Sequence, residues 1–128
     1  MKQKKKRKIT YRSAKNKGKI LQNWVANELS KILGIPFEKD GDIDSRPIGQ
    51  SGVDVMLRGE AQKLFPYSIE CKNCESWSVP GWIRQAKANK KEGTDWMLFC
   101  RKNYHDEIVI MDAERFFELY GRLLEKDS

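Results

Sequence analysis

The sequence has little of the material from which several common kinds of functional site are built. It contains three cysteines and one histidine among its 128 residues. Three cysteines do not make a framework of paired disulfides, so a reducing compartment is expected. No Gly-rich phosphate loop of the Walker type and no dinucleotide-binding fingerprint is present. Chemistry driven by bound nucleotides is therefore not expected.

Long hydrophobic runs are also missing. No apolar stretch approaches the roughly 20 residues that a membrane-spanning helix needs. No hydrophobic region follows the basic start of the chain, so a secretory signal is not expected either. These absences predict a cytoplasmic protein that has no membrane partner.

Acidic residues are absent from the first 19 positions, which instead hold ten Lys and Arg. Residues 20–128 hold the other 15 basic side chains and all 18 acidic ones, a net charge of −3 against +7 for the whole chain. The division predicts a flexible basic arm over residues 1–17, extended by its own repulsion, and a single folded domain over 18–128. Such an arm indicates a polyanionic partner, most often a nucleic acid. The arm's candidate DNA-binding residues are Lys4, Lys5, Lys6, Arg7, Lys8, Arg12, Lys15 and Lys17.

Beyond the arm, apolar residues recur at helical spacing and predict a helix over 18–33, ended by Gly34 and Pro36. Residues 38–52 are rich in Gly, Asp, Ser and Pro and predict an irregular loop. The elements expected after this loop are strands over 53–57 and 65–72 joined as a hairpin through a turn at 58–63, a helix over 80–91, strands over 96–101 and 107–111, and a last helix capped by Asp112. This order predicts a mixed α/β domain with one central sheet.

Three charged residues stand out on the two predicted hairpin strands. Alternate residues of a strand share a face, so Glu70 and Lys72 project to the same side while Cys71 points to the core. A hairpin can bring Asp54, which lies between two valines, beside Glu70. Two carboxylates that close repel each other unless a cation lies between them. Lys72 can supply part of that charge, and a hard divalent cation such as Mg²⁺ would supply it better.

The segment Gly52-Val53-Asp54-Val55, followed by Glu70-Cys71-Lys72, resembles the nuclease superfamily named for its PD-(D/E)xK motif. The resemblance extends over residues 18–112, with Val53 in place of the motif's proline. It implies a restriction-endonuclease-like core, in which helices flank a central mixed β-sheet. Within the superfamily, the small single-domain build with an acidic residue in the first helix is most similar to the Holliday-junction resolvases of archaea and phages.

The resemblance also implies roles for individual residues. Asp54 and Glu70 would bind Mg²⁺, for which Mn²⁺ would substitute, and the backbone carbonyl of Cys71 could add a ligand. Lys72 would orient or deprotonate the attacking water and stabilise charge on the phosphate. Glu28 matches an acidic residue of the first helix that completes the metal site in the resolvase-like branch; its other interpretation is an ordinary polar-face residue.

Four further residues are weaker candidates. Gln85 resembles a glutamine that several branches place near the site, and Ser51 lies where resolvases often have a serine near the scissile phosphate. Arg84 and Lys87 lie on the basic side of the second helix, where they either contact phosphates or are simply solvated.

Cys71 and Cys74 have the CxxC spacing of zinc and redox sites. A structural zinc site needs four ligands, and the only other candidates are Cys100 and His105. We therefore interpret Cys71 as a core residue behind the catalytic face.

These observations together predict a metal-dependent DNA endonuclease, most like a resolvase of four-way junctions that acts as a homodimer, since one chain offers one site and two symmetric strands are cut. If the gene is carried by a phage, the host cytoplasm is the expected location. Two alternatives remain open. One is another nuclease of the superfamily, such as a restriction-like, nicking or single-strand-specific enzyme. The other is a non-catalytic nucleic-acid-binding module whose carboxylates form ordinary salt bridges.

Overall fold

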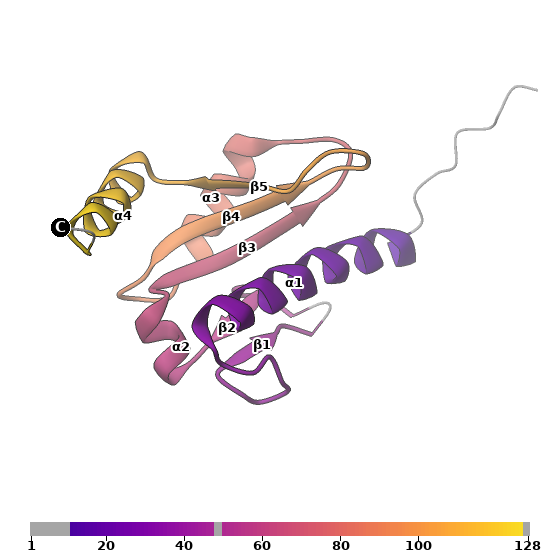
Figure 1. The fold of residues 1–128 in the computed structure, drawn as a ribbon. Helices are drawn as coiled ribbons and strands as arrows, with labels where there is room; N and C mark the ends of the chain where they lie inside the picture. Colours follow the sequence, from indigo (N-terminus) through magenta and orange to yellow (C-terminus); the bar gives the residue numbers. More distant parts are fainter. Residues whose placement is uncertain (1–10, 48–49, 127–128) are drawn as a thin grey trace, which may run out of the picture.

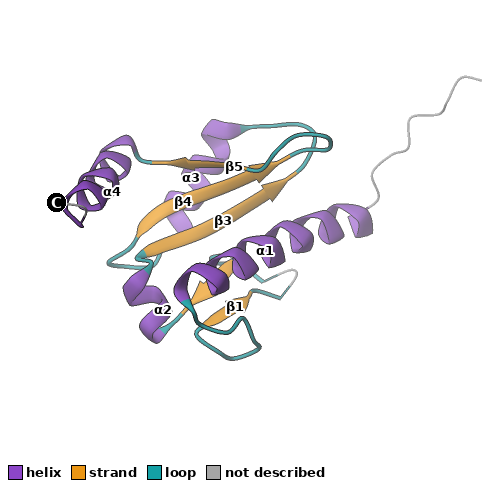
Figure 2. Cartoon of the chain, viewed as in Figure 1, coloured by secondary structure: helices purple, strands orange, loops and turns teal. Residues whose placement is uncertain are grey.

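A computed structural model describes residues 11–47 and 50–126, which are arranged around a five-stranded sheet (Figures 1 and 2). The strands lie in chain order, β1-β2-β3-β4-β5; β3 and β4 are parallel, and the other neighbours are antiparallel. The predicted α/β class, with a central mixed sheet flanked by helices as in a restriction-endonuclease-like core, is confirmed. The elements are α1 (Tyr11–Leu33), β1 (Ile43–Ser45), β2 (Val55–Leu57), α2 (Gly59–Leu64), β3 (Tyr67–Asn73), α3 (Val79–Asn89), β4 (Asp95–Arg101), β5 (Ile108–Met111) and α4 (Ala113–Lys126).

Helices α1 and α3 cover opposite faces of the sheet, with α1 in front of it and α3 behind it in Figure 1. Leu21, Val25 and Leu29 recur at helical spacing on α1, and their side chains form one apolar core with residues of β1, β2 and β3. On the other face, α3 packs over β4 through a second, smaller core. The sheet therefore separates two apolar layers, and each side chain of β3 faces one layer or the other.

Helix α1 begins at Tyr11, seven residues before the predicted start at residue 18. Residues 11–17 are thus helical rather than part of an extended arm. The last residue of this segment contacts the end of β3: Asn73 Nδ2 donates a hydrogen bond of 2.8 Å to the carbonyl of Lys17, and Lys17 Nζ lies 3.3 Å from a carboxylate oxygen of Glu75. The predicted arm residues 1–10 lie outside the described part of the chain.

Two short elements were not predicted. Strand β1 lies within the segment 38–52 that was expected to be an irregular loop, and helix α2 replaces the predicted turn at 58–63. Each is anchored by one fully buried apolar side chain, Ile43 in β1 and Ala61 in α2. Such short elements contain too few residues to show a periodic pattern, and the polar residues around them are typical of loops and turns. Strands β2 and β3 are nevertheless antiparallel neighbours, as expected of the predicted hairpin.

The predicted helix boundaries are confirmed at two caps. Gly34 follows α1 with φ +68°, a backbone conformation that favours glycine, and its N–H donates to the carbonyl of Ser30. Asp112 Oδ1 accepts hydrogen bonds from the backbone N–H groups of Glu114 and Arg115 and so caps α4. None of the helices in the two described segments has the length and apolar character that a bilayer-spanning helix needs.

Candidate active site

The structure brings Asp54 against β3 beside Glu70. Val55 of β2 pairs with Ile69 of β3, so the residues before and after them are neighbours as well. The backbone N–H of Asp54 donates to the carbonyl of Ile69 at 2.9 Å, and Asp54 Oδ2 accepts a hydrogen bond of 2.7 Å from the backbone N–H of Cys71. The carboxylate of Asp54 is therefore fixed at the residue that follows Glu70.

Glu70 and Lys72 share the face of β3 that looks toward α3. In the parallel register they stand opposite Leu98 and Cys100 of β4, both of which belong to the core beneath α3. Cys71 points the other way, into the core beneath α1, as predicted. Burial raises the pKa of the Cys71 thiol well above its ordinary value, with further contributions from the nearby carboxylates. Cys71 is thus a packing residue that presents its backbone, rather than its thiol, to the site.

Glu70 is the most deeply buried charged residue among the described ones, with only 2% of its surface exposed. Burial raises its pKa to about 7, and the neighbouring Asp54 carboxylate adds to the increase. Two partners oppose it: Asn89 Nδ2 donates a hydrogen bond of 2.8 Å to Glu70 Oε1, and the charge of Lys72 lowers the pKa. The two carboxylates and the ammonium group therefore form one electrostatic unit.

Asn89, at the end of α3, was not predicted as a site residue. Its side chain is half-buried, and its bond to Glu70 fixes the orientation of that carboxylate. The only available signal was its position four residues after Gln85, which places the two amides on one helix face. A polar residue near a helix end does not by itself distinguish this role from ordinary solvation.

The donor set suits a hard divalent cation. Asp54 and Glu70 supply carboxylate oxygens, and the pKa of Glu70 is raised first by burial and then by the charge of Asp54, which a cation between them would offset. Within residues 11–47 and 50–126, no third Asp, Glu, His or Cys joins them to form a three-ligand cluster. Mg²⁺ tolerates such a site, since it commonly keeps several waters and takes only one or two carboxylates from the protein.

Glu28 is not brought to this pair. It lies on α1, which covers the opposite face of the sheet, and its carboxylate is 3.3 Å from Lys31 Nζ at the solvent-exposed surface. This position agrees with its other interpretation, a polar-face residue. The first helix therefore contributes no carboxylate to the site among the residues described.

Gln85 and Ser51 lie nearer to the site, but their side chains make no hydrogen bond within the described segments. Helix α3 runs antiparallel to β3, because it connects the end of β3 to the start of the parallel strand β4. One helical turn and two strand residues cover similar distances, about 5.4 and 6.6 Å. Since Asn89 lies at the level of Glu70, Gln85 lies near the level of Lys72 with its side chain exposed. Ser51 is exposed in the loop that leads to Asp54.

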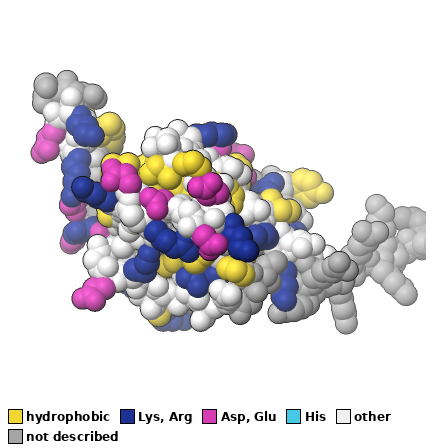
Figure 3. All heavy atoms as spheres, turned by 90° about the horizontal axis from the view of Figure 1, so that it is seen from below, with side chains coloured by type: hydrophobic (Ala, Val, Ile, Leu, Met, Phe, Trp, Pro, Cys, Tyr) yellow, Lys and Arg dark blue, Asp and Glu magenta, His cyan; other side chains and the backbone are white. Residues whose placement is uncertain are grey.

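The candidate DNA-binding residues are spread over several elements. Lys15 and Lys17 lie in α1, and Lys17 is paired with Glu75. Arg84 and Lys87 are exposed on α3, where Lys87 Nζ lies 6.0 Å from the ring centroid of Trp96. In the view of Figure 3, Lys and Arg side chains alternate with Asp and Glu over the folded part, which is not uniformly basic. Arg12 lies in α1, but its side chain falls outside the described part of the structure, as do residues Lys4 to Lys8.

The comparisons with known proteins agree with this geometry. A family model described as "Phage putative PDDEXK endonuclease" matches residues 13–127, almost the whole chain, including β2, β3 and α3. No curated protein and no solved structure matches the chain.

Proposed function

Because the chain belongs to the family of phage PD-(D/E)xK endonucleases, we propose that it is a metal-dependent DNA endonuclease whose active site is formed by Asp54, Glu70 and Lys72. The observation that carries the proposal is the convergence of these three residues. The Asp54 carboxylate is fixed 2.7 Å from the backbone of β3, directly beside Glu70, and Lys72 lies on the same strand face. A structural salt bridge would not need a second carboxylate placed against a buried first one.

The proposed ligands of Mg²⁺, or of Mn²⁺ in its place, are Asp54, Glu70 and the backbone carbonyl of Cys71. When bound, such a cation supplies a Lewis acid for the phosphoryl oxygens and lowers the pKa of water. Lys72 contributes a fixed positive charge that stabilises the negative charge developing on the phosphate, and it orients the attacking water. Asn89 holds Glu70 in place through its hydrogen bond, and Gln85, one turn earlier on the same helix, would contact the same water.

We further propose that the preferred substrate is a four-way DNA junction. The resemblance to resolvases supports this choice, and the basic side chains of Arg84 and Lys87 on α3 would contact phosphates beside the site. The basic residues of the arm and of the first turns of α1 would add affinity that is independent of sequence. Each chain would therefore offer one cutting site together with basic groups that bind the DNA around it.

One electrophoretic assay tests the proposed activity. The protein is incubated with a four-way junction, a linear duplex and a single strand, each with Mg²⁺, with Mn²⁺ or with chelator. We expect paired symmetric cuts on the junction with either cation and none with chelator. Cutting of linear or single-stranded DNA instead would identify another nuclease specificity of the family. No cutting of any substrate would contradict the nuclease and favour a non-catalytic binding module.

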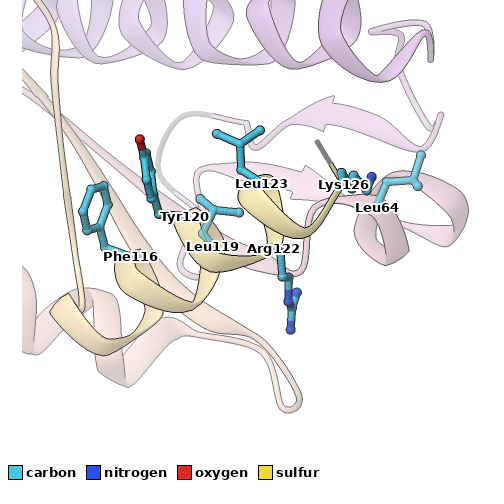
Figure 4. Close-up of a pocket in the computed structure, with 7 residues that line it drawn as sticks. All are labelled: Leu64, Phe116, Leu119, Tyr120, Arg122, Leu123 and Lys126. Carbon is cyan, nitrogen blue, oxygen red and sulfur yellow. The ribbon is translucent and has the colours of Figure 1, made fainter. Parts of the chain in front are cut away.

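The proposed homodimer has a candidate surface on α4. This helix lies at one end of the sheet and has no buried residue in the described chain (Figure 1). Its apolar side chains gather on one face, where Phe116, Leu119, Tyr120 and Leu123 line a pocket of about 420 Å³ together with Leu64 of α2 (Figure 4). A 14-residue helix is only marginally stable in water unless its apolar face is covered.

A second copy of the chain is the occupant that we propose for this face. A twofold axis would place two α4 helices against each other and supply the two sites that symmetric cutting needs. The polar edge of α4 does not oppose this pairing, since Glu118 already pairs with Arg115 at 3.0 Å and with Arg122 at 2.7 Å within the helix. Glu114 lies 3.5 Å from Arg115 as well, so two acidic side chains balance the two arginines along that edge.

Substitution of Leu123 by glutamate tests the dimer. Burying a carboxylate in an apolar interface is expected to raise the dimer dissociation constant at least thirtyfold, about 2 kcal/mol, the size of an interface hot spot. Analytical ultracentrifugation across micromolar concentrations measures it. The matched control is Ile32→Glu, which alters an apolar residue of α1 that is 77% exposed. A wild-type chain that is monomeric at these concentrations, or a Leu123→Glu variant that dimerises like the control, would contradict the surface.

A further inference from the structure

A second hollow lies directly beside the carboxylate pair, and of its lining residues only Asn89 has a role in the chemistry proposed above. Its volume is about 410 Å³, within the range of small-molecule sites. It shares a wall with the active site, because Val53 precedes Asp54 and Asn89 binds Glu70. We call it the basic pocket, and its lining residues are Arg46, Gly52, Val53, Met56, Arg58, Asn89 and Lys91.

Three of the lining residues are cations that the sequence places far apart. Arg46 follows β1, Arg58 follows β2 and Lys91 follows α3. They are close enough to act on one another, since burial lowers the pKa of Lys91 and the charges of Arg58 and Arg46 lower it further. A protein surface that holds three like charges together carries a repulsive cost unless an anion joins them.

The acidic residues of the described segments offset this charge only in part. The only ion pair that involves the three cations within residues 11–47 and 50–126 is a long one, 3.8 Å between Arg58 Nη2 and Asp44 Oδ2. Arg46 Nε donates to the carbonyl of Val53, and Lys91 Nζ donates to the carbonyl of Leu57 at 2.8 Å. Neutral carbonyls fix these two side chains in position and leave their positive charges uncompensated.

The backbone is shaped to hold the pocket in this form. Gly52 has φ +113°, a conformation that side chains rarely adopt, and a Cβ atom there would lie 2.8 Å from Cζ of Arg46. The guanidinium group therefore packs directly against the Gly52 backbone, on the loop that leads to Asp54. Long basic side chains on an ordinary solvated surface need no such accommodation.

We propose that the basic pocket binds a phosphate group of the DNA strand, next to the phosphodiester that is presented to Asp54 and Glu70. This inference rests on the proposed function for the identity of the polymer. The guanidinium forks of Arg46 and Arg58 match the oxygens of a phosphate, and Lys91 adds a point charge. The pocket volume leaves room for the attached sugar. A phosphate held there would set which bond of the strand lies at the carboxylates.

Two sources of this phosphate are chemically equivalent, an internal phosphodiester and a 5′-terminal phosphate. Binding without cleavage is measured in chelator, over a range of salt concentrations, for the Arg58→Gln/Lys91→Gln variant. The control is Lys31→Gln/Lys39→Gln, which removes the same charge from exposed positions of α1 and of the loop that follows it. Closed circular duplex, which has no ends, is compared with linear duplexes that carry 5′-phosphate or 5′-hydroxyl ends.

The loss of one phosphate contact should lower the slope of log K against log salt by about 0.9, equivalent to about eightfold in affinity at 0.1 M salt relative to 1 M. A loss on circular DNA identifies an internal phosphate, and a loss confined to the 5′-phosphorylated duplex identifies the terminal one. Either result supports the pocket. Equal slopes and affinities for the variant and its control on every DNA would overturn it.

A titration of the unaltered protein keeps the test valid if the double variant does not fold. Inorganic phosphate is added at constant ionic strength, and the backbone amide signals are followed by NMR. Shifts are expected at Gly52, Val53 and Lys91, and not at Lys31. No shift at the pocket residues in the presence of phosphate would also overturn the proposal.

The two proposals fail in distinguishable ways. If the protein cuts DNA with Mg²⁺ but the pocket variant binds DNA like the control, the proposed nuclease activity is supported and the proposed phosphate site is contradicted. If the protein cuts no DNA but its DNA affinity depends on the pocket, the proposed nuclease activity is contradicted and the proposed phosphate site is supported.

Discussion

Replacing Lys72 by alanine, or Asp54 by asparagine, is expected to lower the rate of DNA cleavage by about a hundredfold to a thousandfold. Removing one group that stabilises a developing oxyanion commonly costs about 10²–10³ in rate, and both residues also set the charge balance of the site. An asparagine in place of Asp54 would keep the shape of the side chain and an oxygen for the hydrogen bond from the Cys71 backbone. The Asp54→Asn loss would therefore report the missing negative charge rather than a collapsed strand.

DNA binding in chelator provides the second measurement. Neither substitution touches the basic arm, so affinity for DNA should stay within about threefold of the unaltered protein. The matched controls are Lys31→Ala and Asp106→Asn, which change an exposed residue of α1 and an exposed residue of the loop between β4 and β5. Both controls should cut at the normal rate. Residual cleavage by a purified Asp54→Asn/Lys72→Ala double variant would show that the site is elsewhere.

The sequence was sufficient to predict the placement of these residues. The period-2 pattern of β3 put Glu70 and Lys72 on one face and Cys71 on the other, and the structure shows this alternation. The antiparallel pairing of β2 and β3 also followed from the pattern. Patterns of this kind persist because one face of each strand is buried, and burial fixes the register.

Contacts between distant segments could not be predicted in the same way. Asn89 reaches Glu70 across 19 positions, and the three cations of the basic pocket come from three separate loops. No local pattern distinguishes Arg46 or Arg58 from any other surface arginine. The predicted start of helix α1 is too late for a related reason, because Lys17, which was assigned to the arm, contacts Asn73 and Glu75 far along the chain.

Glu28 is a residue for which the sequence left two interpretations open, a site residue or a polar-face residue. Its place on the first helix matched a family pattern, but the helix phase puts it at the surface beside Lys31. Leu21, Val25 and Leu29 pack against the sheet, whereas the Glu28 side chain is 42% exposed beside Lys31. A resemblance at one position is thus weaker evidence for where a side chain lies than the packing of the whole helix.

The metal-free protein is expected to lose stability as the pH rises from about 4.5 to about 7, through the carboxyl of Glu70. Its pKa is raised to about 7 in the fold from 4.5. Between these values the unfolded chain releases a proton that the folded chain retains, so each pH unit removes about 1.4 kcal/mol, or about 3 kcal/mol over the whole interval. Below pH 4.5 the full stability is present, and above pH 7 the loss is complete.

Urea unfolding of Glu70→Gln in chelator isolates this contribution. The glutamine keeps an oxygen for the Asn89 hydrogen bond and carries no charge, so the variant should become more stable than the unaltered protein as the pH rises, by about 3 kcal/mol at pH 8, while losing cleavage. Glu60→Gln, at an exposed position of α2, provides the control for removing a carboxylate. If the difference in the free energy of unfolding between Glu70→Gln and the unaltered protein does not change with pH, the fold does not raise the pKa of Glu70. A growing difference would show that the fold holds Glu70 at a cost in stability, as expected of a carboxylate placed for a cation rather than for packing.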